Sequence, residues 1–140
     1  MSNDKFHGDA ELAANFTYAS AVSAPMTIHY SVHVHGETQS AADIRWGNAY
    51  TNIQYKVGLW DGTTNQGVVE FQAGTVETFG DGSKKIIDGM VQGAFIFPNP
   101  TPGHWYFVYF YCHIEGNSSH GGAKGSIVID GIAGNVYITF

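Results

Sequence analysis

The sequence predicts an all-β domain, an antiparallel β-sandwich of the jelly-roll or Greek-key kind with about 8–10 strands. Three observations predict it. Apolar and polar residues alternate with a period of two through several segments, as in strands with one buried face. The chain carries 18 glycines, enough for many turns and bulges. Charged residues make up only 13% of the sequence, too few to give long helices a solvated face.

Length and composition indicate a single packed domain over residues 1–140. Hydrophobic residues are 44% of the 140 residues and aromatic residues 14%, which is enough to build a core at this chain length. No internal repeat or linker divides the sequence. Residues 1–10 are polar, and we expect them to form a mobile N-terminal segment.

The first half of the chain alternates most clearly. After a break at Pro25, Met26–His35 predicts a strand with four apolar residues on one face and three histidines on the other. Ile53–Leu59 predicts a second strand with the same period. Asp61-Gly62, directly after it, is a strong signal for a tight turn.

Glycine and proline divide the second half. Gly89 and Gly93 indicate a bulge or bend within Ile86–Phe97. Residues 98–103 predict a rigid turn, and the nearly unbroken apolar run Trp105–Ile114 predicts a central strand buried on both faces. The remaining expected strands are Val68–Phe71, Val76–Phe79, Ser126–Asp130 and Asn135–Phe140.

Charge excludes several classes of function. The net charge is −6, and among the six basic residues only Lys84-Lys85 form an adjacent pair. A nucleic-acid partner is not expected, because phosphate binding needs clustered Lys or Arg. No stretch approaches the ~20 apolar residues of a transmembrane segment. No catalytic motif marks the chain as an enzyme.

The N-terminus suggests where the protein acts. Residues 1–5 lack the basic and apolar regions of a secretory signal. We therefore expect a cytoplasmic protein, or one released without a signal peptide. If a signal had been removed from the chain, the same sequence would belong to an extracellular protein.

Aromatic residues next to polar turns predict a lectin-like, non-enzymatic module that binds a glycan or glycolipid as a homo-oligomer. Sugars stack their apolar faces on aromatic rings, while amide, carboxylate and hydroxyl groups hold the sugar hydroxyls. The aromatic excess comprises Trp46, Tyr50, Trp60, Phe97, Trp105, Tyr106, Tyr109 and Tyr111. The predicted ligand-binding residues are Trp60, Asp61, Thr63, Asn65, Gln66, Asn117, Ser119 and His120.

The histidines give a second hypothesis, a bound copper or zinc ion. His33 and His35 share one strand face at a spacing that lets both imidazoles reach one metal. A third ligand would have to come from His104, Cys112, His113 or His120, and the predicted metal residues are His33, His35 and either Cys112 or His120. The alternative is that the histidines form the polar face of an exposed strand and Cys112 is a small buried hydrophobe. Apart from this metal, no cofactor is expected.

Two short patches carry a resemblance to a metal-binding family. His33-Val34-His35-Gly36 and the stretch from Tyr111 to Gly116 resemble the copper-ligand segments of cupredoxin domains and multicopper oxidases. That resemblance implies a cupredoxin-like domain with Cys112 as the thiolate ligand and His120 as a partner imidazole. By alternation, however, Cys112 and His113 point to opposite faces of their strand.

The chain is also similar to small cytosolic β-sandwich lectins, and in places to aegerolysins and actinoporins. Ile44-Arg45-Trp46-Gly47 and residues 121–127 resemble aegerolysin segments, and residues 97–106 resemble the aromatic lipid-contacting loop of actinoporins. These resemblances imply binding to a glycan or membrane lipid. A third hypothesis, a self-assembling structural subunit, fits the same polar, glycine-rich strands.

Overall fold

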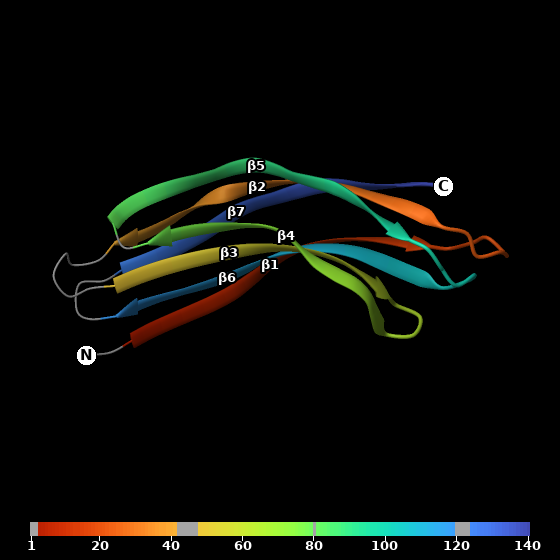
Figure 1. The fold of residues 1–140 in the computed structure, drawn as a ribbon, viewed down its shortest axis with the longest axis horizontal. Helices are drawn as coiled ribbons and strands as arrows, with labels where there is room; N and C mark the ends of the chain where they lie inside the picture. The colour runs from red at the N-terminus through yellow and green to blue at the C-terminus, as the bar shows by residue number, and fades with distance from the viewer. Residues whose placement is uncertain (1–2, 42–47, 80, 120–123) are drawn as a thin grey trace.

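The computed structural model describes the backbone of residues 3–41, 48–79, 81–119 and 124–140, and the side chains of 11–38, 51–77, 85–116, 129 and 132–140. Over these residues the chain is all β, with seven strands in two antiparallel sheets that face one another (Figure 1). The predicted sandwich is confirmed. The strands are β1 (Asn3–Thr17), β2 (Met26–Ala41), β3 (Asn48–Asp61), β4 (Gln66–Phe79), β5 (Asp81–Phe97), β6 (Trp105–Ser119) and β7 (Lys124–Thr139).

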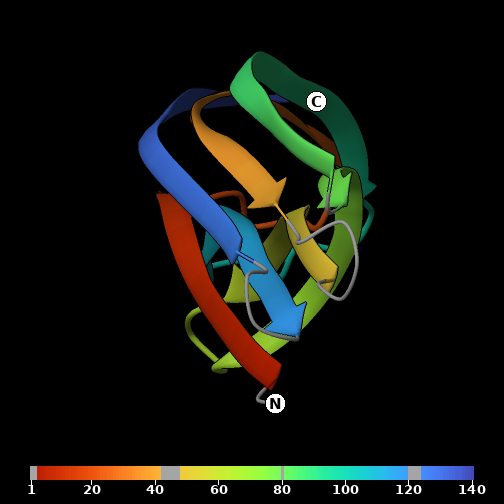
Figure 2. The same cartoon turned by 90° about the vertical axis from the view of Figure 1, so that its left-hand side faces the viewer.

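The two sheets are built from strands distant in sequence. The four-stranded sheet has the order β1-β6-β3-β4, and the three-stranded sheet has the order β5-β2-β7. Only β3 and β4 are consecutive in the chain and adjacent in a sheet. Every other pair of consecutive strands is divided between the two sheets, which Figure 2 shows end on. β6 lies inside the four-stranded sheet, as the sequence predicted for its apolar run.

The described strands are fewer and longer than predicted, because segments expected to be separate join across bulges. Residues 68–71 and 76–79 both belong to β4, whose register against β3 shifts twice. Residues 126–130 and 135–139 both belong to β7, with one shift against β2. A bulge allows one strand to bend and continue pairing, so an internal glycine need not end it.

The glycines of β5 have a different role from the one predicted. The pairing of β2 with β5 keeps one register past both Gly89 and Gly93, so the expected bulge is not found there. At Gly93 a Cβ would lie 2.6 Å from the hydroxyl oxygen of Tyr30. This glycine leaves room for a core side chain of the neighbouring strand.

The N-terminal segment is part of the four-stranded sheet. Residues 3–10, expected to be mobile, belong to β1 and pair with β6 from Asn3–Ser119 onward. Residues 3–10 are mostly polar and show no apolar alternation, so their sequence did not predict a strand. Their backbone groups nevertheless gain ladder partners, because β6 presents an unpaired edge to them.

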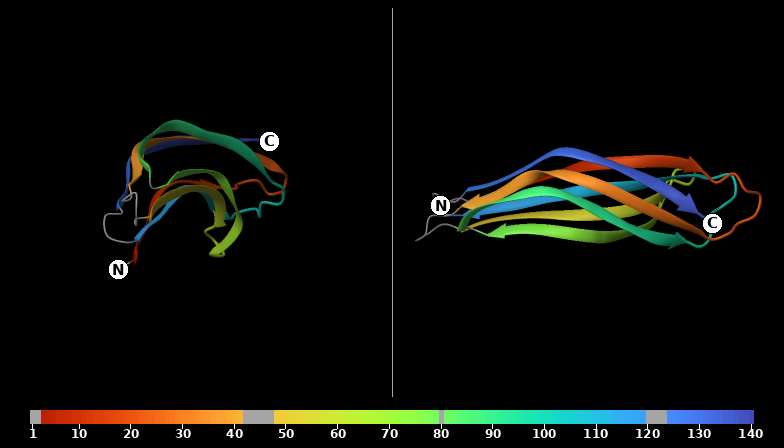
Figure 3. Two further views of the ribbon diagram at one scale, coloured as in Figure 1. Left: turned by 60° about the vertical axis from the view of Figure 1, so that its left-hand side comes forward. Right: turned by 90° about the horizontal axis from the view of Figure 1, so that it is seen from above.

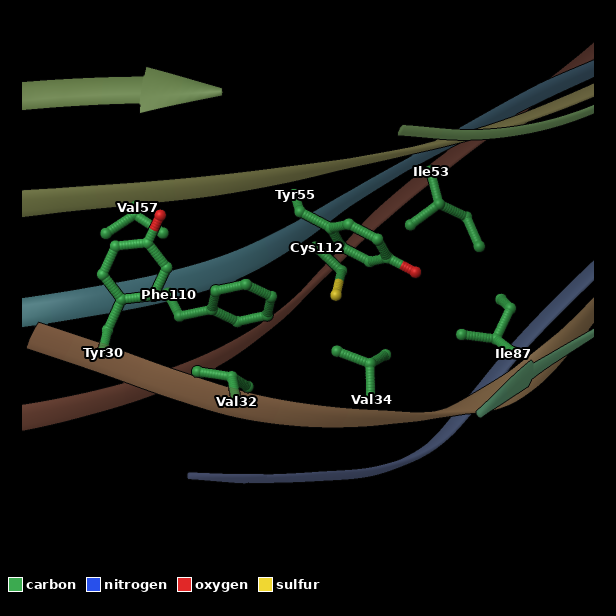
Figure 4. Close-up of a cluster of buried hydrophobic side chains, with 9 residues drawn as sticks. All are labelled: Tyr30, Val32, Val34, Ile53, Tyr55, Val57, Ile87, Phe110 and Cys112. Carbon is green, nitrogen blue, oxygen red and sulfur yellow. The ribbon is translucent and has the colours of Figure 1, made fainter. Parts of the chain in front are cut away.

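The core lies between the sheets. Alternate residues of β2, including Tyr30, Val32 and Val34, point inward, and Cys112 of β6 is fully buried opposite them (Figure 4). Cys112 is therefore the small buried hydrophobe that one of the sequence hypotheses described. The even residues Tyr106, Val108, Phe110 and Cys112 are buried, but the odd residues from 105 to 115 are partly exposed. The prediction that this strand is buried on both faces was wrong.

Ile53→Ala is expected to lower the free energy of unfolding by about 2–5 kcal/mol, because Ile53 is completely buried and alanine would leave a cavity. Urea denaturation would measure the loss. The matched control is Ile86→Ala, since Ile86 is 64% exposed and its loss should change stability by about 0.5 kcal/mol or less. Equal effects of the two substitutions would contradict the assignment of the core.

Candidate functional site

The odd residues of β6 form a row of aromatic rings on the outer face of the four-stranded sheet. Neighbouring ring centroids are 6.0 Å apart from Trp105 to Phe107, 6.0 Å from Phe107 to Tyr109, and 6.1 Å from Tyr109 to Tyr111. Trp60, on the adjacent strand β3, is paired with Phe107 in the sheet. Its ring stacks 6.3 Å from the Phe107 ring. The five rings thus form one continuous surface, which we call the aromatic row.

The sheet curves around the aromatic row and forms an open hollow of about 660 Å³. The two register shifts against β3 lie in β4, and bulges of this kind bend and twist a strand. The hairpin of β3 and β4 curls away from the other sheet (Figure 1; Figure 3). The outer face is therefore concave. The hollow is lined by Glu11, Trp60, Gly62, Asn65, Glu70, Trp105, Phe107, Tyr109, Tyr111 and His113.

Two glycines let the rings lie close to the backbone of β3 and its turn. A Cβ at Gly58 would lie 2.1 Å from the Tyr109 ring, and one at Gly62 would lie 2.2 Å from the Trp105 ring. The predicted turn is confirmed, and its left-handed residue is Asn65, with φ of 58°. Gly62 is thus required for ring packing and not for a positive φ.

A network of hydrogen bonds clamps this turn to the start of β6. The Asp61 carboxylate accepts from the backbone N–H groups of Thr63 and Thr64 at 2.9 and 3.0 Å, and its second oxygen lies 2.9 Å from Nδ1 of His104. Gly62 N–H donates to the Trp105 carbonyl, and Trp105 N–H donates to the Thr63 hydroxyl. The clamp positions Trp105 beside the turn.

Glu70 of β4 is the polar centre of the hollow. Its carboxylate accepts hydrogen bonds from Tyr109 at 2.6 Å and Tyr111 at 3.3 Å, and Lys56 lies 3.9 Å away. Burial and the Glu70 carboxylate raise the pKa of Tyr109, so its hydroxyl stays protonated. The three side chains place a carboxylate and two phenols, groups suited to binding hydroxyls, beside exposed ring faces.

The structure brings together only some of the predicted ligand-binding residues. Trp60 and Asn65 line the hollow, whereas Asp61 and Thr63 are engaged in the clamp. Gln66 is exposed and pairs with Asp61 in the ladder.

The second predicted loop is far from the hairpin. Asn117 pairs with Tyr50, at the end of β3 opposite the hairpin. Asn117 lies ten positions after Phe107 in β6, which is roughly 33 Å in a strand. Ser119 lies two residues further on, and His120 is outside the described residues. The hairpin and this end of β6 therefore do not form one site.

The predicted metal ligands are also separated. His33 and His35 lie on the outer face of the three-stranded sheet, where His33 Nε2 is 2.5 Å from an Asp88 oxygen. Cys112 lies on the other side of that sheet, in the core. Within the described parts of the chain, no three His, Cys, Asp or Glu side chains are grouped to hold a metal.

The alternation within β6 is the signal that sequence reasoning missed. Read as two rows, residues 105–113 place aromatic rings and a histidine on the odd face and mainly core residues on the even face. Interpreted as one apolar run, they predicted a strand buried on both faces. Trp105, Tyr109 and Tyr111 counted toward the aromatic excess, but none of them was among the predicted ligand-binding residues. Glu11 and Glu70 carried no sequence signal, because three strand pairings bring them to one face.

Comparisons with known proteins assign no family. No protein-family model and no curated protein matches the chain. Similar solved structures include the icosahedral particle of infectious bursal disease virus, at 12% identity and TM-score 0.22 over 97% of this chain and 38% of that chain. Another is the Gx strain of that virus, at 11% identity and TM-score 0.23 over 98% of this chain and 40% of that chain. The chain thus spans about two fifths of the length of the viral chains. TM-scores this low support no conclusion about this protein.

The described residues contain no helix of the length and apolarity needed to span a membrane.

Asp61→Asn is expected to loosen the clamp. Burial would raise the pKa of Asp61, but hydrogen bonds from His104 and from the N–H groups of Thr64 and Thr63 outweigh it, and the pKa is lowered. Asp61 therefore stabilises the fold above its unfolded-state pKa, and this contribution disappears as pH decreases through the folded-state pKa. The substitution should lower the free energy of unfolding by about 1–3 kcal/mol at neutral pH. It should also abolish the part of the decrease in stability at acidic pH that comes from protonation of Asp61. Urea titrations from neutral to acidic pH would measure both, and an unchanged pH dependence would contradict this role of Asp61.

Cys112 is expected to be unreactive in the folded protein. Its side chain is fully buried, and burial raises the pKa of its thiol to about 11, so little thiolate is present at neutral pH. An aromatic disulfide reagent should label it only as the chain unfolds, at a rate that increases with denaturant. Rapid stoichiometric labelling without denaturant would show that the core opens in the native state.

Proposed function

We propose that this chain is a lectin-like, non-enzymatic domain that binds a glycan in the hollow, either a free glycan or the headgroup of a glycolipid. The observation that supports this best is the aromatic row, which lies partly exposed in a concave face beside the Glu70 carboxylate. Trp105 is 41% exposed although it belongs to a central strand. Rings left open to solvent at such a position are available to a ligand.

The chemistry of the hollow fits sugars. A pyranose ring has one apolar C–H face, which stacks on an aromatic ring, and a rim of hydroxyls that need hydrogen-bond partners. The row supplies the ring faces. Glu70, Asn65 and the phenols of Tyr109 and Tyr111 supply acceptors and donors next to them. A volume of about 660 Å³ is also within the range of small-molecule sites.

The other two hypotheses have less support. A site for copper or zinc at His33 and His35 would need further ligands, and Cys112 is on the far side of the sheet. Assembly into an oligomer or larger particle stays a prediction that light scattering would test.

Trp60→Ala is expected to weaken glycan binding about fivefold or more, because the loss of one stacked ring costs roughly 1 kcal/mol. A glycan array would identify a ligand, and titration calorimetry with that ligand would compare the variants. Tyr137→Ala is the matched control, since Tyr137 is a 60% exposed ring on the opposite sheet.

Two results would contradict the proposal. If wild-type protein binds no glycan, either free or on vesicles, the proposed glycan binding is wrong. If a folded Trp60→Ala variant binds the glycan with wild-type affinity, the glycan does not bind in the hollow.

A further inference from the structure

The shape and charge of the hollow indicate which glycan it takes. We infer that the hollow holds one uncharged, linear glycan chain, which lies along β6 over several consecutive sugar units. This inference rests on the proposed carbohydrate binding. This excludes two other modes of recognition, the capture of a single terminal sugar and adsorption to a flat crystalline polysaccharide surface.

The length of the aromatic row supports binding of several sugar units. Tyr111 lies six positions after Trp105 in β6, which is about 20 Å of extended strand. Ring centroids recur every 6.0–6.1 Å along it without a gap. A single sugar would cover one or two of these rings and leave the others exposed to water. A chain of sugars covers them all.

The tilt of the rings argues against a flat ligand. Successive rings along β6 are inclined to one another by 31°, 53° and 26°. The surface is also concave, because the hairpin of β3 and β4 curls around one side of it (Figure 3). A crystalline face needs coplanar rings on a flat surface. A single chain in solution can turn about its glycosidic bonds and follow the tilt.

The charge of the hollow disfavours acidic glycans. Glu11 on β1 and Glu70 on β4 line its two sides, and the Glu11 carboxylate is close enough to raise the pKa of Tyr109. The cation beside them, Lys56, lies against Glu70. The whole chain carries −6. Uronic acids, sialic acids and sulfated sugars would place negative charge next to these two carboxylates and be repelled by them.

The first test is a length series measured by titration calorimetry. Wild-type protein is titrated with the disaccharide, trisaccharide and hexasaccharide of the uncharged glycan that binds best on an array. Each further stacked sugar is expected to tighten binding by a factor of about five, so the hexasaccharide should bind at least about tenfold more tightly than the disaccharide. Equal affinities would overturn the inference but leave carbohydrate binding intact, whereas no binding at any length would remove the proposed function itself.

The second test compares ligand classes at equal length. An uncharged hexasaccharide is compared with a uronic-acid hexasaccharide, with insoluble crystalline polysaccharide in a pull-down, and with vesicles bearing a glycolipid of one terminal sugar. We expect binding to the uncharged hexasaccharide alone. Tighter binding of the acidic chain, the crystalline solid or the vesicles would each overturn the inference.

A matched pair of glycine variants tests whether the row acts as one surface. In Gly62→Ala, the new methyl group would meet the Trp105 ring at 2.2 Å and displace it, with all aromatic residues retained. Gly89→Ala is the control, because a Cβ there meets nothing within 4 Å. Gly62→Ala should weaken hexasaccharide binding about fivefold or more and disaccharide binding less. Equal losses for both lengths, with both variants folded by circular dichroism, would contradict a ligand that extends along β6.

Discussion

The two-residue alternation of side chains along β6 is the constraint on which the rest of this structure depends. It directs Tyr106, Phe110 and Cys112 into the core and Trp105 and Tyr109 to the outer face. Because both rows belong to one backbone, a shift by one residue would exchange core and site. Pairing with β1 on one side and β3 on the other holds this register along the whole strand. Core stability and the exposure of the aromatic row are therefore coupled.

Exposure of the rings does not by itself make a concave site. The bulges of β4 curve the sheet, and the clamp around Asp61 ties the curved hairpin to the start of β6. Gly58 and Gly62 then let rings lie against the backbone, where a methyl group would collide with them. Together these features prearrange the hollow, which reduces the ordering cost that a ligand would otherwise have to offset.

Sequence reasoning succeeded where one residue pattern has one structural meaning. The alternation of Met26–His35 predicted a half-buried strand, and Ile28 and Val34 are buried as expected. It was insufficient where the neighbouring strand decides whether a segment pairs and which of its faces is buried. Residues 3–10 have no apolar pattern, yet the edge of β6 recruits them into a strand. In the same way, an apolar run such as Trp105–Ile114 is compatible with burial on two faces or with burial on one and an open aromatic surface.

The sequence by itself determined the all-β class, the opposite facing of Cys112 and His113 and the turn after Asp61, because alternation and turn chemistry act over a few residues. Tertiary structure alone decided which aromatic face stays open and which carboxylates stand beside it. Glu11 and Glu70 are 59 positions apart in the chain and reach one hollow only through the pairing of β1, β6, β3 and β4. Strand order is a property of backbone hydrogen bonding between distant segments, which no local pattern of side chains specifies.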